Sequence, residues 1–468
     1  MNTAAAHSSI HDTVTAPESI YERYYACEDK DPLAYAFSAK ATVHAGMKSK
    51  PVVKEEQLPL FRCISREPRS EKSAAYFNIP FCETRCTYCG FFIRFSDPEE
   101  SRRYTDALIA EISATSRTEA VNKWPIHAVY LGGGTPTSLQ PQDLLRLLLS
   151  IKRLLPLAND CEITLEGRIS GLSPELIEAA IVGGVNRFSI GVQSFDTDIR
   201  QATGRIDDRE TVIATLKRLC SHDQAAVVID LVYGFPGQTM EMWEQDIYTL
   251  QELPLDGVDL YQLNLLPHTT LARMVKDGTS KPAATLPEQS AMYARGVELM
   301  QELHWQRLSI SHWRTGNRER SLYNRLVKSG APILAYGCGA GGSLHGYRYA
   351  NSRDYNDYMQ TVADGIKPLA MLAYPAPNKA LANLVSDGFD LGMLNLQAMA
   401  AAPDNTSLND WALPLLQQWQ RAGLLQISGN WLQLTRAGEF WQVTMAQALL
   451  NLCEEFTAEK NVEAQDND

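Results

Sequence analysis

The chain has 468 residues, of which 45% are hydrophobic and 21% charged, so it can bury a large core in more than one structural unit. Its net charge of −12 argues against a general nucleic-acid surface, and no apolar run approaches the roughly 20 residues that a bilayer span needs. The N-terminus lacks the basic and then apolar pattern of a secretory signal, so we expect a cytoplasmic protein.

Residues 1–72 form a predicted N-terminal extension. Its first residues, to about 20, are rich in Ala, Ser, Thr and His without periodicity, so we expect them to be disordered. Short helices are predicted within YERYYA and DPLAYAFSAK, and KSKPVVKEEQLP is typical of an exposed connector.

Between residues 73 and 270, predicted strands and helices alternate. The strands are short, apolar and mostly rich in β-branched or aromatic residues: SAAYFNIP, HAVYLGGG, CEITLEGR, RFSIGVQ, AAVVIDLVYG and GVDLYQLNLL. The segments between them carry apolar residues at helical spacing, and Ser173 before Pro174 is typical of a helix N-terminus. The alternation predicts an α/β fold, a partial six-stranded (β/α) barrel whose functional residues lie at the carboxyl ends of the strands.

The alternation weakens after residue 270. We assign 271–371 to an extension that forms the substrate pocket and 372–455 to a C-terminal, mainly helical domain, with 456–468 as a disordered tail. A helix, a turn and a hairpin across SGN make this domain winged-helix-like. Its few scattered cations do not favour nucleic-acid binding.

Nine cysteines in a chain of this length do not form a disulfide framework, and six of them are isolated. The other three, Cys82, Cys86 and Cys89, follow the first strand with C-x3-C-x2-C spacing. Three thiolates in a tight loop can bind three irons of a cubane and leave the fourth iron open, which is the mark of a reactive site. A structural zinc site is the alternative, but it needs a fourth ligand, and Cys63 and His44 are poorly spaced for that role.

The spacing, with Tyr88 before the last cysteine, resembles the signature of the radical S-adenosylmethionine (SAM) superfamily. The ordered motifs YFNIPFC, LGGGTPT, ITLEGR, RFSIGVQSFD and DLVYGFPGQT are similar to the oxygen-independent coproporphyrinogen dehydrogenases and their relatives. The resemblance implies a [4Fe–4S] cluster whose open iron is chelated by SAM, and reductive cleavage of SAM to a 5′-deoxyadenosyl radical.

Several polar residues stand where the predicted strands end. Glu166 can accept hydrogen bonds from an ammonium or ribose, Gln193 can bond a ribose hydroxyl, and Arg205 suits a carboxylate. Asp230 within an apolar strand needs a ligand or an ion pair. A surface salt bridge is the alternative for Glu166, and an ordinary tight turn for the glycine run. The resemblance implies a SAM-binding set of Tyr76, Tyr88, Gly133, Gly134, Thr135, Glu166, Gln193, Arg205, Asp230 and Asn264.

Residues 304–353 contain eight Lys and Arg against the single acid Glu319, and aromatic residues are interleaved with them. Such a stretch suits a planar, apolar substrate with carboxylates, such as a porphyrin, and equally an exposed basic face. The candidate substrate residues are His268, His312, Arg314 and His345. The alternative for each histidine is a structural role, which is more common for an isolated His.

The N-terminal extension, through DPLAYAFSAK and KSKP, resembles the haem-utilisation branch of the subfamily, the anaerobilin synthase type. The resemblance implies anaerobic opening of the haem ring to a linear tetrapyrrole, with iron release and transfer of a SAM-derived methyl carbon. The alternatives are coproporphyrinogen III decarboxylation and a non-catalytic haem chaperone. The expected partners are haem and an electron donor such as a flavodoxin or a reduced flavin/NADPH system, with no nucleic acid and no membrane.

Overall fold

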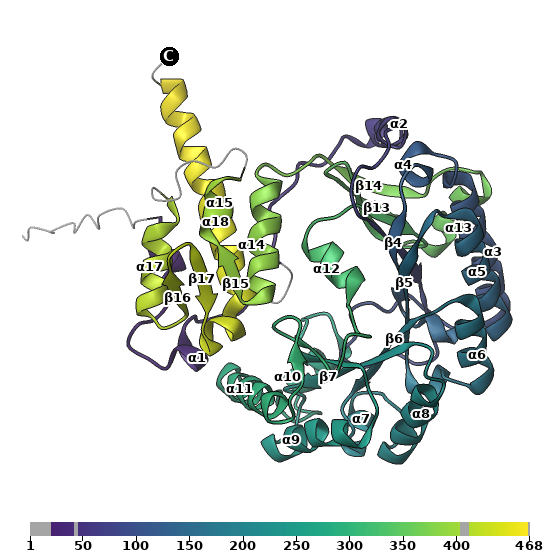
Figure 1. Cartoon of the computed structure of the whole chain (residues 1–468), viewed down its shortest axis with the longest axis horizontal. Coiled ribbons are helices and arrows are strands. Elements are labelled where there is room, and N and C mark those ends of the chain that lie inside the picture. Colours follow the sequence, from purple (N-terminus) through teal and green to yellow (C-terminus); the bar gives the residue numbers. More distant parts are fainter. Residues whose placement is uncertain (1–19, 42–44, 403–410, 467–468) are drawn as a thin grey trace, which may run out of the picture.

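The computed structural model describes residues 20–41, 45–402 and 411–466 (Figure 1). The predicted disordered N-terminal segment and His44 therefore lie outside the described residues, apart from residue 20. Helix α18 continues to Asp466, through most of the segment 456–468 that the sequence predicts to be a disordered tail. That segment contains neither Gly nor Pro, the residues that most disfavour helix.

A run of parallel strands forms the centre of the fold and follows the chain order. Each predicted strand is present: β1 (Ala74–Ile79), β4 (Ile126–Gly133), β5 (Leu157–Gly167), β6 (Arg187–Gln193), β7 (Ala226–Tyr233) and β8 (Gly257–Gln262). The register aligns Gly191 with Asp230, and Asp230 with Asp259. Because side chains alternate along a strand, one polar set of residues faces the inside of the barrel.

Helices cover the outside of this sheet: α3 (Pro98–Thr115), α5 (Pro141–Leu154), α6 (Pro174–Gly183), α8 (Arg209–Ser221), α9 (Met240–Thr249) and α11 (Leu286–Glu302). Shorter helices lie between them: α4 (Glu119–Asn122), η2 (Pro136–Ser138), η3 (Ile169–Gly171), α7 (Thr197–Ala202), η4 (Leu250–Glu252) and α10 (Thr270–Lys276). The predicted N-cap is confirmed, since Ser173 accepts a hydrogen bond from the Leu176 amide at 3.2 Å.

The segment 271–371 supplies both edges of the sheet. On one side lie β9 (Gln306–Arg307) and β10 (His312–Arg314), and on the other β11 (Ile333–Tyr336), β12 (Gly341–Leu344), β13 (Tyr347–Asn351) and β14 (Leu369–Ala373), giving 12 strands. Helix α13 (Tyr355–Ala363) follows β13. Helix α12 (Leu322–Lys328) lies within the ring of strands (Figure 1). Its Leu326 packs on Ala74 and Ala128, so α12 closes the end of the barrel where β1 and β4 begin.

The C-terminal domain lies beside the open side of the barrel (Figure 1). Its elements are α14 (Lys379–Leu391), β15 (Met393–Asn395), α15 (Leu396–Ala400), α17 (Leu413–Arg421), β16 (Leu425–Ser428), β17 (Trp431–Leu434) and α18 (Arg436–Asp466). The predicted hairpin is confirmed as β16 and β17, and β15 completes an antiparallel sheet. Ion pairs tie the domain to the barrel, with Arg307 2.7 Å from Glu439 and Lys328 3.2 Å from Asp390.

The N-terminal extension connects these two bodies. It contains η1 (Glu22–Tyr24), α1 (Pro32–Tyr35) and α2 (Lys54–Ile64). The indole of Trp441 donates to the Pro32 carbonyl at 3.0 Å, and the Val52 amide donates to Leu372 in β14 at 2.8 Å. The extension therefore runs from the C-terminal domain to the edge of the sheet. No described helix combines the length and the apolar character that crossing a bilayer demands.

Candidate functional site

The three clustered cysteines lie above the carboxyl end of β1. Cys82 ends the short strand β2 (Phe81–Cys82), and Cys86 and Cys89 lie in the loop before β3 (Arg94–Phe95). Cys82 and Cys86 are buried, while Cys89 is partly exposed. The Thr135 hydroxyl donates to the Cys82 sulfur at 3.4 Å. A hydrogen bond to a thiolate favours its charged form, so Thr135 opposes the effect of burial on Cys82.

The arrangement fits a cubane rather than a single metal ion. Burial raises the pKa of Cys82, and the nearby Cys86 and Cys89 raise it further, so the three sulfur atoms share one environment. Among the described residues, no three His, Cys, Asp or Glu side chains converge as ligands of one ion. Ligands of three separate irons in a cubane need not converge on one point. The Cys82, Cys86 and Cys89 set is therefore the one that can hold the cluster.

The glycine run ends β4 directly beside this loop. Gly133 has φ of +109°, and a Cβ there would lie 2.2 Å from the Asn78 side-chain oxygen. A Cβ on Gly134 would lie 2.6 Å from the Phe81 carbonyl oxygen. The structure thus gives a packing reason for these two glycines: they let β4 approach the strand that carries Cys82.

Glu166 lies inside the barrel near this turn. It accepts hydrogen bonds from the Tyr130 hydroxyl at 2.6 Å and from the Gly133 amide at 3.2 Å. Burial raises its pKa, and these two bonds oppose the rise. Glu166 is thus not the exposed member of a surface salt bridge, and it joins the glycine turn to the lumen.

Tyr88, Gln193 and Arg205 come together on the other side of the lumen. Arg205 donates to the Gly191 carbonyl at 2.8 Å and to the Tyr88 hydroxyl at 3.0 Å. Burial raises the pKa of Tyr88 to about 12, against the opposing charge of Arg205. The Nε of Arg205 and the Oε1 of Gln193 are buried without a hydrogen-bond partner among the described residues. Such atoms are costly unless a ligand satisfies them.

Asp230 projects from β7 toward the same space. The described residues provide no hydrogen bond to its carboxylate, and part of its surface stays accessible although protein surrounds it. Burial and the neighbouring Asp259 and Glu166 raise its pKa well above the usual value, while Arg187 and His312 oppose the rise. An uncompensated carboxylate of this kind favours a cationic or hydroxyl-bearing ligand.

Below Asp230 lies a buried charge network that the sequence did not reveal. Arg187 and Glu319 form an ion pair at 2.9 Å, and His312 lies 2.8 Å from Asp259 and 3.2 Å from Glu319. Burial opposes the charge on His312, but the two carboxylates outweigh it and raise its pKa to about 9. Arg187 and His312 in turn lower the pKa of Glu319 to about 2 despite its burial.

Tyrosines fill the space between the network and the glycine turn. Tyr130 stacks on Tyr323 from α12 with ring centroids 4.4 Å apart, and Tyr76 stacks on Tyr130 at 6.3 Å. The Tyr76 hydroxyl donates to the Asn78 side chain at 2.9 Å. Tyr76 therefore lies against the lumen, while Tyr130 and Tyr323 are lumen residues that the motif analysis did not single out.

The candidate substrate residues do not share one pocket. His268 lies near the cluster loop, since a Cβ on Gly90 would be 3.4 Å from its Nε2. Asn264 follows β8 and is exposed. His345, in the turn before β13, lies 3.1 Å from the Glu67 carbonyl, and Arg314 donates to the Glu319 carbonyl at 3.2 Å. His345 and Arg314 thus lie toward the end of the barrel opposite the cluster loop.

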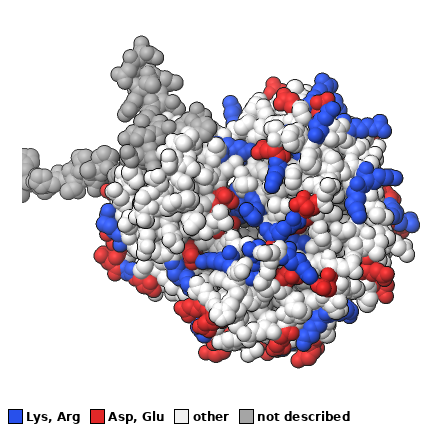
Figure 2. Space-filling model, in the orientation of Figure 1, with Lys and Arg blue, Asp and Glu red and all other residues white. Residues whose placement is uncertain are grey.

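Two of these placements correct the expected substrate pocket. Both nitrogens of His312 face carboxylates, so neither is available to a substrate iron. The basic stretch 304–353 is dispersed, with Arg307 paired to Glu439, Arg318 to Asp223 and Lys328 to Asp390. Figure 2 shows Lys and Arg interleaved with Asp and Glu over the visible face rather than gathered into one patch. The stretch lacks nearby acids in the sequence, but the fold brings them from elsewhere.

Comparisons with known proteins show which family the chain belongs to. Residues 78–248 match the family model of the radical SAM superfamily. The chain is 39% identical to an anaerobilin synthase of Escherichia coli O157:H7 over 411 residues, which is 87% of this chain and 91% of the relative. It is 32% identical to the heme chaperone HemW of Lactococcus lactis over 62% of this chain and 74% of that protein.

The fold has a solved counterpart. The structure of coproporphyrinogen III oxidase (HemN) from Escherichia coli aligns with a TM-score of 0.73 over 86% of this chain and 96% of that chain. The two sequences are 20% identical, so this likeness establishes the architecture alone.

Proposed function

The chain belongs to the radical SAM superfamily, and we propose that it opens the haem ring without oxygen, forming a linear tetrapyrrole and releasing the iron. The proposal includes transfer of a SAM-derived methyl carbon to the product. The observation that carries it is the similarity to an anaerobilin synthase, which spans 87% of the chain and so extends far beyond the matched radical SAM segment.

The residues present fit the groups that the family implies. Cys82, Cys86 and Cys89 would hold a [4Fe–4S] cluster. When bound and reduced, this cluster supplies the electron that cleaves SAM to a 5′-deoxyadenosyl radical. The protein contributes a buried loop and the Thr135 hydroxyl on Cys82.

The polar groups that face the lumen would hold SAM. Asp230 and Glu166 present acceptors for an ammonium or ribose hydroxyls, and Gln193 presents a buried amide oxygen. Arg205, anchored by Gly191 and Tyr88, offers a guanidinium to a carboxylate. Gly133, Gly134, Thr135, Tyr76 and Asn264 complete the proposed set.

Haem would approach from the end of the barrel that carries the cluster loop, because a radical formed there must reach it directly. His268 is the candidate that lies beside this loop, near Gly90. The electron donor that we expect is a flavodoxin or a reduced flavin/NADPH system.

The test uses the anaerobically reconstituted protein with its cluster reduced. Supplied with SAM and haem, it should bleach the haem absorption band, cleave SAM and yield a linear tetrapyrrole by mass spectrometry. Haem that binds but persists while SAM stays intact would instead establish the chaperone function, to which the HemW similarity points. Loss of carbon dioxide from coproporphyrinogen III, with haem ignored, would establish the decarboxylase function.

A further inference from the structure

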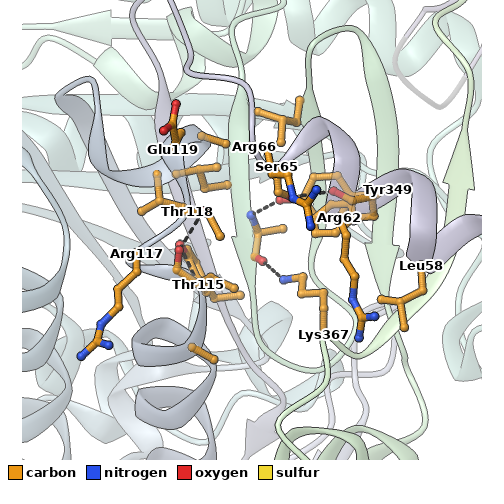
Figure 3. A pocket seen from close by; sticks show the side chains of 18 of the residues that line it. Leu58, Arg62, Ser65, Arg66, Thr115, Arg117, Thr118, Glu119, Tyr349 and Lys367 are labelled. Carbon is orange, nitrogen blue, oxygen red and sulfur yellow. Dashed lines mark hydrogen bonds between the residues drawn. The ribbon is translucent and has the colours of Figure 1, made fainter.

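A pocket of about 390 Å³ lies outside the barrel lumen (Figure 3). Helix α2, the end of α3 and the strands β11 and β13 surround it. None of its lining residues belongs to the cluster loop, the glycine turn or the lumen. Its volume lies within the range of about 300 to 1,000 Å³ that is typical of small-molecule sites.

The inner wall of the pocket is apolar and aromatic. Phe61 and Tyr349 meet edge to face at 4.9 Å, and Leu334 and Leu344 lie beside them. Lys367 reaches the pocket, but its charge is already matched because its amine lies 2.7 Å from Glu111. The wall therefore offers hydrophobic surface and no free charge.

The rim of the pocket is basic. Arg62 and Arg66 come from α2 and the turn after it, and Arg117 comes from the opposite side, after α3 (Figure 3). Within the described part of the chain, none of the three has an ion-pair partner, and Glu119 is the one acid that lines the pocket. Some arginines elsewhere are paired, as Arg94 is with Glu100 at 2.6 Å.

Unpaired guanidiniums at the mouth of an apolar cavity leave positive charge available to an anionic ligand. A guanidinium binds a carboxylate through two parallel hydrogen bonds, and burial of an apolar body adds hydrophobic free energy. Because the guanidiniums lie on opposite sides of the pocket opening, they suit a ligand with two anionic groups. They also suit a ligand with one anionic group, which the arginines of either side can bind.

We propose that this pocket is a second binding site, for a small amphipathic carboxylate whose apolar body fills the cavity and whose carboxylates pair with Arg62, Arg66 and Arg117. The site is separate from the radical chemistry and does not depend on the proposed function. Two sources share this ligand chemistry: a tetrapyrrole with propionates and a long-chain fatty acid.

The test titrates the full-length, cluster-loaded protein with protoporphyrin IX and with palmitate, and measures affinity and stoichiometry by calorimetry. The double variant Arg62→Gln/Arg66→Gln and the single variant Arg117→Gln remove rim charges. Each should weaken the pocket's ligand by about tenfold or more, since a hydrogen bond to a charged group is lost. Arg153→Gln, on the exposed side of α5, is the matched control and should bind as the wild type does.

A steric variant keeps the test independent of charge. Ala114 is exposed and lines the pocket, so Ala114→Trp fills the cavity without entering the core. It should abolish binding at this site while iron content and SAM cleavage stay unchanged. If protoporphyrin also occupies the catalytic site, the number of equivalents bound per chain should fall from two to one in this variant.

The outcomes separate the two sources and the failure. Loss of a protoporphyrin equivalent in the rim and Ala114→Trp variants identifies a tetrapyrrole site, and loss of palmitate binding identifies a fatty-acid site. The proposal is overturned if every variant binds both probes as the wild type does, or if protoporphyrin dimethyl ester binds as tightly as the free acid. Failure of haem opening would leave this binding result unaffected.

Discussion

The two ends of the barrel lumen hold similar side chains but differ in whether their charged groups lie within ion-pair distance of an opposite charge. At the inner end, each charge of the Arg187, Glu319 and His312 network lies within ion-pair distance of an opposite charge. Toward the cluster loop, Asp230 has no hydrogen bond from a described residue, and Arg205 Nε and Gln193 Oε1 are unsatisfied. Charge pairing, rather than complete hydrogen bonding, distinguishes the two ends, because the Nη2 of Arg187 also lacks a hydrogen-bond partner among the described residues.

The largest expected effect is at the cluster loop itself. Cys86→Ala should abolish the cluster and all SAM cleavage, because a cubane held by three thiolates cannot spare one. Cys161→Ala and Cys220→Ala serve as controls and should keep both, since these cysteines lie apart from the loop. Iron and sulfide analysis after anaerobic reconstitution measures the cluster content of each variant. A full cluster in Cys86→Ala would overturn the ligand assignment.

The next largest effect concerns the stability that the ion pairs at the inner end of the lumen contribute. Arg187→Met removes one partner of a buried ion pair and leaves Glu319 uncompensated, which should lower the free energy of unfolding by about 3–5 kcal/mol. Arg318→Met breaks the exposed pair with Asp223, and should lower it by less than about 1 kcal/mol. Urea unfolding of the two variants compares them directly. Equal losses would mean that burial does not distinguish the pairs.

Substitutions at the end of the lumen toward the cluster loop should weaken SAM binding more than they lower the free energy of unfolding. Asp230→Ala and Glu166→Ala should keep the cluster but weaken SAM binding by about 1.5–3 kcal/mol, or roughly ten- to a hundred-fold. Asp230→Ala should cost little stability, because the carboxylate that it removes is not compensated in the protein alone. SAM titration followed by electron paramagnetic resonance of the reduced cluster measures the affinity. Unchanged titration curves would return both residues to a structural role.

The smallest expected effect is the pH dependence of the paired end. The pKa of His312 in the folded protein, about 9, lies above its ordinary value of 6.5. Its contribution is therefore fully present below about pH 6.5 and is lost as the pH rises through about 9. The cost of His312→Gln in the free energy of unfolding should thus be larger at about pH 7 than at about pH 9.5. A cost that does not change between these two pH values would contradict a charged imidazolium.

Much of the fold followed from local pattern. Each predicted strand between 73 and 262 is present, because short apolar segments between amphipathic helices are typical of a parallel sheet. The motif residues Glu166 and Asp230 lie near one another because the carboxyl ends of parallel strands share one end of the barrel. The edges of the sheet were not predicted, since the edge strands are short and join the central strands through long-range pairs, β11 with β1 and β10 with β8.

The predicted substrate pocket rested on charged residues whose partners lie far away in the sequence. The excess of basic residues at 304–353 suggested a pocket, but Arg307, Arg318 and Lys328 find acids in other parts of the chain. His312 looked like an isolated histidine, and the fold places it between two carboxylates. A count of charges along the sequence does not show which opposite charges the fold places beside them.

The sequence by itself determined the order of the central strands and predicted the cluster ligands, because both depend on patterns along short stretches of chain. Only the tertiary structure decided which buried charges are paired and which stay open to a ligand. Arg187 and Glu319 are 132 residues apart, and no local pattern links them. The free energy of a buried charge depends on what lies within a few ångströms of it, and that distance is a property of the fold.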